Sequence, residues 1–352
     1  HFCLLICRMP SEDKKYMSRA LALAQLGIGK VAPNPLVGCV IVKNDRIIGE
    51  GYHQKFGESH AEVNAVASAH ELVKGATVYV TLEPCAHHGK TPPCTALLIR
   101  SEVARVVIAC QDPFNQVNGR GIEQLRAAGI RVDVPFMQQE AEYVNRRFLT
   151  AVLQKRPYVI LKWAQTFDGF IARENFDSKW ISTDASRQLV HKWRAEEGAL
   201  LVGYNTAKYD DPHLTTRDWS GSNPVRIVLD PQNELDRALH IFNGQAQTII
   251  ISQKAVVNFD HVRFMEWDAK SAHMDVLLEG LNALGIQSLI VEGGARTLQQ
   301  FIQNQTWDEA RVFTSPMEFG AGIKAPVLAL VPTEQKQSAK DNLAIYYNEK
   351  NR

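Results

Sequence analysis

The sequence predicts an α/β protein of two domains. Its 352 residues exceed the usual size of a single domain, which is about 150 residues. Apolar stretches typical of strands alternate with amphipathic stretches typical of helices along both halves of the chain. The charged segment 154–157, which ends in proline, separates the two series. We therefore expect a first domain at 10–153, a linker at 154–157 and a second domain at 158–352.

Composition excludes several classes of protein. Hydrophobic residues make up 45% of the chain and charged residues 22%, which is typical of a globular protein and not of a disordered one. The formal net charge of +1 provides no basic field for a nucleic acid. Six cysteines in a chain of this length do not form a small disulfide scaffold, so we expect a cytoplasmic protein that binds no membrane.

Residues 1–9 are interpreted as a non-native or disordered extension. Their apolar run is too short to span a membrane, and no basic segment precedes it as in a signal peptide. Met9 is expected to be the natural start.

The first half is expected to contain strands and helices in alternation. Apolar residues at helical spacing predict a first helix, and a hairpin-like turn follows between two strands. Ser59 is expected to be the N-cap of a helix that begins near residue 61. The expected strands are 37–42, 47–51, 78–82, 106–109 and 131–134, and the other expected helices are 12–27, 95–101, 122–128 and 140–153.

The stretch from residue 59 to residue 94 predicts a catalytic zinc site. His60 and Glu62 lie in the motif H-A-E, and Cys85 and Cys94 follow. One imidazole and two thiolates give three protein ligands, whereas a structural zinc site normally closes with four. The open position admits a water whose pKa falls to about 7. Glu62, two residues after the histidine, has the place of the proton shuttle of zinc deaminases.

Two alternatives remain open. A zinc-stabilised scaffold without catalysis requires a fourth protein ligand, for which His87 and His88 are the nearby candidates. A deaminase that acts on a flipped nucleic-acid base is the other alternative. The near-zero charge and the long insert between Cys85 and Cys94 argue against it.

The second half predicts a further strand and helix series. The expected strands are 158–164, 199–203, 226–230, 248–252 and 288–292, and the expected helices are 185–195, 274–284 and 296–303. Gly293 and Gly294 precede the last helix, where backbone N–H groups can approach a phosphate. The G-x-G-x-x-G fingerprint is absent, so the residues alone leave this turn either structural or phosphate-binding. The same two readings apply to Gly119-Arg120-Gly121 in the first half.

Several motifs resemble one known family. The loop P-C-A-H-H-G-K-T-P-P-C, with P-N-P-L-V-G upstream, resembles the bifunctional deaminase–reductase family of riboflavin biosynthesis. The order T-x-D-G, S-x-W-I, D-D-P-x-L-T-x-R and V-E-G-G resembles the reductase domain of that family. The resemblance implies a cytidine-deaminase-like three-layer domain followed by a dihydrofolate-reductase-like α/β domain. It also implies zinc-dependent deamination of a ribosylated diaminopyrimidinone 5′-phosphate, followed by NADPH-dependent reduction of the ribose.

The resemblance further implies a role for individual residues. Zinc is expected at His60, Cys85 and Cys94, with Glu62 as the catalytic residue. The deaminase substrate is expected at Asn34, His53, His87, Lys90, Asp112 and Asn115. NADPH is expected at Ala164, Trp180, Thr206, Asp210, Gly294, Ala295, Arg296, Thr297, Leu298, Gln299 and Gln300. The reductase substrate is expected at Ser178, Arg194, Leu214, Arg217 and Glu292, where the two arginines suit a phosphate because guanidinium pairs oxyanions bidentately. The expected partners are small phosphorylated pyrimidines and further copies of the same chain, in a homo-oligomer whose size the sequence does not fix.

Overall fold

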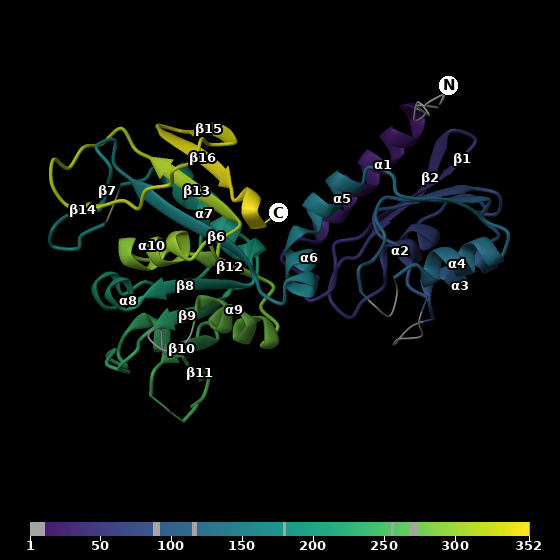
Figure 1. Ribbon diagram of the computed structural model, residues 1–352. Helices are drawn as coiled ribbons and strands as arrows, with labels where there is room; N and C mark the ends of the chain where they lie inside the picture. Colours follow the sequence, from purple (N-terminus) through teal and green to yellow (C-terminus); the bar gives the residue numbers. More distant parts are fainter. Residues whose placement is uncertain are drawn as a thin grey trace, which may run out of the picture. The chain divides into compact units, whose positions relative to one another are not determined.

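The computed structural model describes residues 11–86, 92–114, 118–178, 181–254, 257–267 and 273–351. The chain divides between Gln154 and Lys155 into two compact units (Figure 1). Each unit is built on its own sheet with helices, so the predicted α/β class is confirmed. The extension expected at residues 1–9 lies outside the described residues. None of the helices in the described ranges combines the length and the hydropathy that a membrane-spanning segment needs.

The first unit is built on a mixed sheet. Its strands are β1 (Gly38–Lys43), β2 (Arg46–Tyr52), β3 (Thr77–Val80), β4 (Arg105–Ile108) and β5 (Arg131–Asp133). They lie in the order β2-β1-β3-β4-β5; β1 runs antiparallel to β2 and β3, while β3, β4 and β5 are parallel. The helices are α1 (Ser11–Ala24), η1 (Gln25–Gly27), α2 (Ala61–Ala67), α3 (Cys94–Arg100), α4 (Arg120–Ala127), α5 (Gln138–Val144) and α6 (Arg146–Leu153).

Helices cover both faces of this sheet. Successive side chains of a strand point to opposite faces, so each apolar strand supplies two cores. Val40 and Val107 belong to the core that includes residues of α1 and α5. Ile41 and Ile108 belong to the core that includes residues of α2, α3 and α4. The result is the three-layer arrangement expected for the first domain.

Helix α2 lies very close to β2 because two glycines face it. A Cβ atom at Gly49 would approach the carbonyl oxygen of Ala65 to 2.4 Å, and one at Gly51 would approach its backbone nitrogen to 2.3 Å. Any side chain at these positions would push the helix away from the sheet. Because α2 begins directly after His60, the two glycines set the depth of that residue and of Glu62 in the unit.

The single helix expected at 140–153 is wrong, because the chain breaks it at Asn145. This residue ends α5 and precedes α6, with φ −94° and ψ 12°. Its side-chain oxygen accepts a hydrogen bond from the backbone nitrogen of Leu36 at 2.8 Å, and its amide group donates to the carbonyl oxygen of Leu36 at 2.9 Å. The buried side-chain amide of Asn145 therefore holds the segment around Leu36, and the helix is interrupted at this residue.

The second unit is built on a nine-stranded sheet together with a separate two-stranded one. The strands are β6 (Tyr158–Gln165), β7 (Phe170–Ala172), β8 (Ala199–Gly203), β9 (Val225–Leu229), β10 (Thr248–Ser252), β11 (Val262–Glu266), β12 (Ser288–Val291), β13 (Glu309–Thr314), β14 (Ile323–Lys324), β15 (Glu334–Ser338) and β16 (Asp341–Tyr347). The large sheet has the order β11-β10-β9-β8-β12-β6-β13-β16-β15. In this order, the seven strands from β11 through β13 are parallel to their neighbours. Strand β16 pairs antiparallel with β13, and β15 pairs antiparallel with β16.

Two helical layers enclose this sheet. The helices are α7 (Asp184–Glu196), α8 (Tyr204–Asp210), η2 (His240–Phe242), α9 (Met274–Ala283), α10 (Ala295–Gln303) and η3 (Glu349–Asn351). One core joins alternate residues of β6 and β8 to α9 and α10, and the other joins the intervening residues to α7 and α8. Strands β8 and β10 are buried along their whole length, as expected for parallel strands that are covered on both faces.

Candidate active sites

Three metal-ligating side chains converge in the first unit. The Nδ1 atom of His60 lies 3.6 Å from the Sγ atom of Cys85 and 3.4 Å from the Sγ atom of Cys94. A tetrahedral zinc ion with a Zn–N bond of about 2.0 Å and Zn–S bonds of about 2.3 Å requires N···S separations of about 3.5 Å. Among the described residues, this is the group of histidine, cysteine and acidic side chains that could hold a metal ion. The donor set and its spacing therefore fit zinc.

The ends of three elements place these ligands. His60 is itself the N-cap of α2, so the expectation that Ser59 would cap the helix is wrong. The carbonyl oxygen of Ser59 instead accepts hydrogen bonds from His53 and Asn64. Cys85 follows the end of β3, and Cys94 is the first residue of α3. The backbone nitrogen of Cys94 donates to the Sγ atom of Cys85 at 3.3 Å, which locks the two thiols together.

The ligand group favours a negative charge on sulfur. Contacts with Cys94 and His60 hold the pKa of the Cys85 thiol well below its ordinary value, whereas contact with Cys85 raises the pKa of Cys94. Contact with Cys85 likewise raises the pKa of His60. A bound zinc ion would take both sulfurs as thiolates.

Glu62 lies in the first turn of α2 beside these ligands. It is buried, and burial raises the pKa of its carboxyl group. Cys39 of β1, which sequence reasoning missed, is also buried next to it: burial and the charge of Glu62 raise the pKa of its thiol. A carboxylate in this setting is shielded from bulk water and within reach of the ligand group.

Asn34 and His53 also lie at this site. The ring of His53 is 5.6 Å from the ring of His60, in an edge-on arrangement. Its Nδ1 atom is 3.1 Å from the carbonyl oxygen of Ser59, which can only accept, so this nitrogen carries the hydrogen. Its Nε2 atom then accepts from the side-chain nitrogen of Asn34 at 3.1 Å. The side-chain nitrogen of Asn34 is therefore the atom that bonds to His53.

Of the other residues expected at the deaminase substrate, the structure describes Asp112 alone. Asp112 is buried, and its side chain accepts a hydrogen bond from the backbone nitrogen of Phe114 at 2.9 Å. His87, Lys90 and Asn115 lie outside the described residues.

Glu83 is a buried carboxylate that sequence reasoning missed. It lies between β3 and Cys85 and is 4% exposed. One of its oxygens accepts from the backbone nitrogens of Gly119 and Asp112 at 3.0 and 3.3 Å, and the other from those of Gly121 and Ile122 at 2.8 and 3.3 Å. The start of α4 is therefore occupied by a carboxylate of this chain, which favours the structural reading of Gly119-Arg120-Gly121 over the phosphate-binding one.

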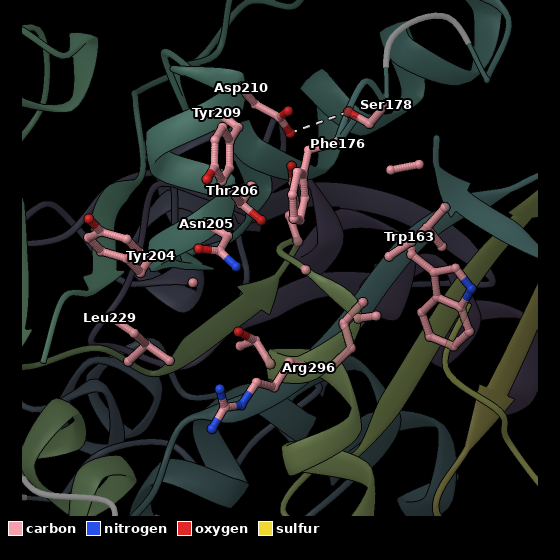
Figure 2. A pocket seen from close by; sticks show the side chains of 18 of the residues that line it. Trp163, Phe176, Ser178, Tyr204, Asn205, Thr206, Tyr209, Asp210, Leu229 and Arg296 are labelled. Carbon is pink, nitrogen blue, oxygen red and sulfur yellow. Dashed lines mark hydrogen bonds between the residues drawn. The ribbon is translucent and has the colours of Figure 1, made fainter. Parts of the chain in front are cut away.

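A large cavity lies in the second unit, with a volume of about 990 Å³ (Figure 2). Most of the residues expected at the cofactor and at the reductase substrate line it: Ala164, Ser178, Arg194, Thr206, Asp210, Arg217, Glu292, Gly294, Ala295, Arg296, Thr297, Leu298 and Gln300. Gln299 is not in its lining, and Leu214 is buried in the core beside α7 and α8. Trp180 lies outside the described residues. The cavity thus brings together segments from β6 to α10.

A charged cluster forms one wall of this cavity. Arg194 of α7 donates from Nε and Nη2 to the two carboxylate oxygens of Glu292, at 3.0 and 2.6 Å. Burial opposes the ionisation of Glu292, but Arg194 and Lys162 outweigh it and lower the pKa of Glu292 to about 2. Lys162 of β6 also lines the cavity and was missed by sequence reasoning; burial lowers its pKa. The guanidinium group of Arg194 is already paired with Glu292. Of the two arginines predicted to bind phosphate, Arg217 is the one without an ion pair among the described residues.

Comparisons with known families agree with the division into two units. The cytidine and deoxycytidylate deaminase zinc-binding region matches residues 10–110, and the RibD C-terminal domain matches residues 157–341. Fold and sites thus define a zinc deaminase joined to a reductase.

Curated relatives match almost the whole chain. The riboflavin biosynthesis protein RibD of Aquifex aeolicus is 44% identical over 92% of this chain and 92% of its own length, and that of Escherichia coli is 41% identical over 89% and 90%. The chain therefore belongs to the RibD family of riboflavin biosynthesis, whose members join a deaminase and a reductase, and the predicted family and bifunctional activity are confirmed.

Solved structures of this family have the same fold over nearly the whole chain. A deaminase–reductase of Thermotoga maritima has a TM-score of 0.85, with 39% identity over 95% of this chain and 98% of that chain. RibD of Acinetobacter baumannii has a TM-score of 0.86, with 33% identity over 96% and 98%. Membership of this family brings with it the two predicted cofactors, zinc and NADPH.

Proposed function

We propose that the chain catalyses two successive steps, with one active site in each unit. The first unit hydrolyses the exocyclic amine of diaminohydroxyphosphoribosylaminopyrimidine, and the second reduces the ribose of the resulting 5-amino-6-(5-phosphoribosylamino)uracil to a ribityl chain. The convergence of His60, Cys85 and Cys94 beside Glu62 carries the proposal, because three ligands leave one zinc position for chemistry.

In the deamination, a ring carbon gains a bond to oxygen and loses its bond to nitrogen. Zinc supplies Lewis acidity, which makes a nucleophile available from water at neutral pH. Glu62 takes the proton that water gives up and delivers it to the departing ammonia. Its burial in the first turn of α2 and its contact with Cys94 support this role, since they keep the carboxylate at the ligands and away from bulk water.

Asn34 and His53 orient the pyrimidine. The hydrogen of His53 is fixed on Nδ1 by the carbonyl oxygen of Ser59, so His53 accepts from the amide nitrogen of Asn34. The amide oxygen of Asn34 is then available to accept an N–H from the edge of the base. His87, Lys90, Asp112 and Asn115 complete the proposed substrate contacts.

The cavity of the second unit binds NADPH and the phosphorylated aminouracil. NADPH supplies the hydride, while the protein orients it against the ribose. The starts of α8 and α10 line the cavity and offer backbone N–H groups to the cofactor phosphates. Arg217 pairs with the substrate phosphate, and the ion pair of Arg194 with Glu292 positions the polar groups of the ribose.

An assay with and without NADPH tests this proposal. The purified chain is supplied with the phosphorylated diaminopyrimidine, and ammonia release, NADPH oxidation and metal content are measured. We expect ammonia release without NADPH and oxidation of NADPH only after deamination or with the deaminated intermediate. Ammonia release from RNA or DNA oligomers, with none from the small substrate, would instead favour a nucleic-acid deaminase.

Two further parts of the proposal concern location and assembly. Cys39, Cys85, Cys94 and Cys110 are free thiols, which supports a reducing, cytoplasmic location. Copies of this chain are further proposed to associate into a homo-oligomer. Light scattering of the purified chain measures the number of copies.

A further inference from the structure

Two aromatic rings are stacked in the wall of the reductase cavity. Phe176 follows β7, and Tyr209 belongs to α8. Their ring centroids lie 4.6 Å apart, and the ring planes differ by 6°. Figure 2 shows the two rings next to the hydrogen bond that Ser178 donates to Asp210, which is 3.3 Å long. The stack therefore lies among residues expected to bind the two ligands.

Both residues of the stack remain partly exposed. Phe176 is 38% exposed and Tyr209 is 53% exposed, and both line the cavity. Each ring covers one face of the other, while the ammonium group of Lys208 lies 5.6 Å from the ring centroid of Tyr209. One face of Phe176 is taken up by the stack with Tyr209, so the face that remains for a ligand in the cavity is the opposite one.

The backbone of Phe176 is in an unfavourable conformation. Its φ angle is +69°, in the left-handed region where bulky side chains are rare. Glycine adopts this conformation without a steric penalty. An aromatic residue held at such a position inside a ligand cavity points to a use for its ring, because strained residues cluster at ligand-binding sites.

We propose that the stack of Phe176 on Tyr209 is a platform for the planar heteroaromatic ring of a ligand bound in this cavity. Aromatic rings pack in offset stacks with centroids about 4.5–7 Å apart. A flat ring on the second face of Phe176 would extend the existing stack by one layer. The inference rests on the proposed function, which provides two such rings: the nicotinamide of NADPH and the aminouracil of the substrate.

Binding measurements on three variants test this platform. Phe176→Gly removes the ring and relieves the backbone, whereas Phe176→Leu keeps an apolar side chain and the strained backbone but has no π face. Phe259→Leu is the matched control, because Phe259 is 39% exposed in the same unit and does not line the cavity. The dissociation constants of NADPH and of the phosphorylated aminouracil are each measured by calorimetry, in separate titrations.

We expect both Phe176 variants to weaken the ligand whose ring occupies the platform by about 2- to 10-fold, as for loss of one aromatic pair. If the dissociation constant of NADPH rises, the ring on the platform is nicotinamide; if that of the phosphorylated aminouracil rises, it is the aminouracil. The control keeps both constants within about 2-fold, and the midpoint of thermal unfolding of Phe176→Gly falls by no more than about 3 °C.

Three outcomes overturn the platform. The first is that Phe176→Gly and Phe176→Leu bind both ligands with unchanged dissociation constants. The second is normal binding by Phe176→Leu, which would mean that apolar bulk suffices. The third is weaker binding only in step with a large loss of thermal stability, which would mean a purely structural pair. A wild-type protein that binds neither ligand would contradict the proposed function itself and is therefore distinguished from these outcomes.

Discussion

Arg194 and Glu292 form a bidentate ion pair in the wall of the reductase cavity, although they lie 98 positions apart in the sequence. Their side chains are only 12% and 8% exposed. The half-buried ammonium group of Lys162 interacts with the same carboxylate. Glu292 therefore neutralises a cluster of buried positive charge, and this cluster would be costly to bury without it.

Replacing Glu292 by Gln should destabilise the second unit by about 3 kcal/mol at pH 7, because the buried guanidinium of Arg194 and the half-buried ammonium of Lys162 lose their counter-charge. All six tryptophans lie between residues 163 and 307, so tryptophan fluorescence during denaturation by urea reports on this unit alone. Glu334→Gln is the control: its ion pair with Lys336 lies on the surface, and its loss should change stability by less than about 1 kcal/mol.

The effect of this substitution should depend on pH. The pKa of Glu292 is lowered to about 2 in the folded protein and is about 4.3 in the unfolded chain. A lowered pKa gives a stabilisation that is complete above the unfolded value and is lost as the pH falls through the folded value. The difference between wild type and Glu292→Gln should therefore shrink between about pH 4.3 and pH 2. A difference that stays constant over this range would contradict the charge argument.

Replacing Cys85 or Cys94 by Ser should remove zinc and abolish ammonia release. Each substitution leaves two protein ligands, which is too few for a stable site. Elemental analysis of the purified variants measures the metal, and Cys110→Ala is the matched control because Cys110 is a buried thiol outside the ligand group.

Reduction of the deaminated intermediate should persist in both ligand variants. Joint replacement of His87 and His88 by Ala should leave zinc bound. Loss of zinc in that variant would instead support a site closed by four protein ligands.

Replacing Glu62 by Gln should lower the rate of ammonia release by about 10²- to 10⁴-fold, since a positioned proton-transfer group contributes about that much. Zinc content and NADPH oxidation with the deaminated intermediate should be unchanged. Glu58→Gln provides the control, because Glu58 is an exposed acid shortly before the same helix. If the substitution at Glu62 abolished both activities together, two independent active sites would be untenable.

Replacing Glu83 by Gln should raise the KM of the deamination by about 10-fold, because charged hydrogen bonds to the segment that carries Asp112 are lost. The turnover number and the zinc content should change much less. Glu123→Gln tests the same helix α4 at an exposed position. A drop in zinc content and thermal stability with an unchanged KM would reduce Glu83 to a purely structural residue.

Much of the fold follows from local patterns. Strands β8 and β10 have the predicted bounds, since a short apolar run between turns is a local signal. Strands β7, β11, β13, β14, β15 and β16 and helix α8 were not predicted. Strand β15 has mostly exposed residues and is a strand only because it pairs with β16. Its formation depends on a partner that the local pattern does not show.

Local signals also misplaced two helix boundaries. The apolar pattern from 140 to 153 gave no sign that Asn145 would bond to Leu36, 109 residues earlier. Ser59 has the residue type of an N-cap, but the helix begins after His60, which has the N-cap position without a side-chain hydrogen bond. At Asn145 a contact with a distant segment outweighed the local preference, whereas at Ser59 the helix starts one residue later than the residue type indicates.

The sequence by itself determined the chemistry of the protein. The residue types and spacing of His60, Glu62, Cys85 and Cys94 predict a zinc deaminase, and the motifs of both halves indicate the family to which the chain belongs. Only the tertiary structure decided the electrostatic partners: Glu292 for Arg194, and Glu83 for the start of α4. Donor types can be read from a chain because chemistry belongs to single residues. Pairing between distant residues arises when the sheets form and bring their ends together.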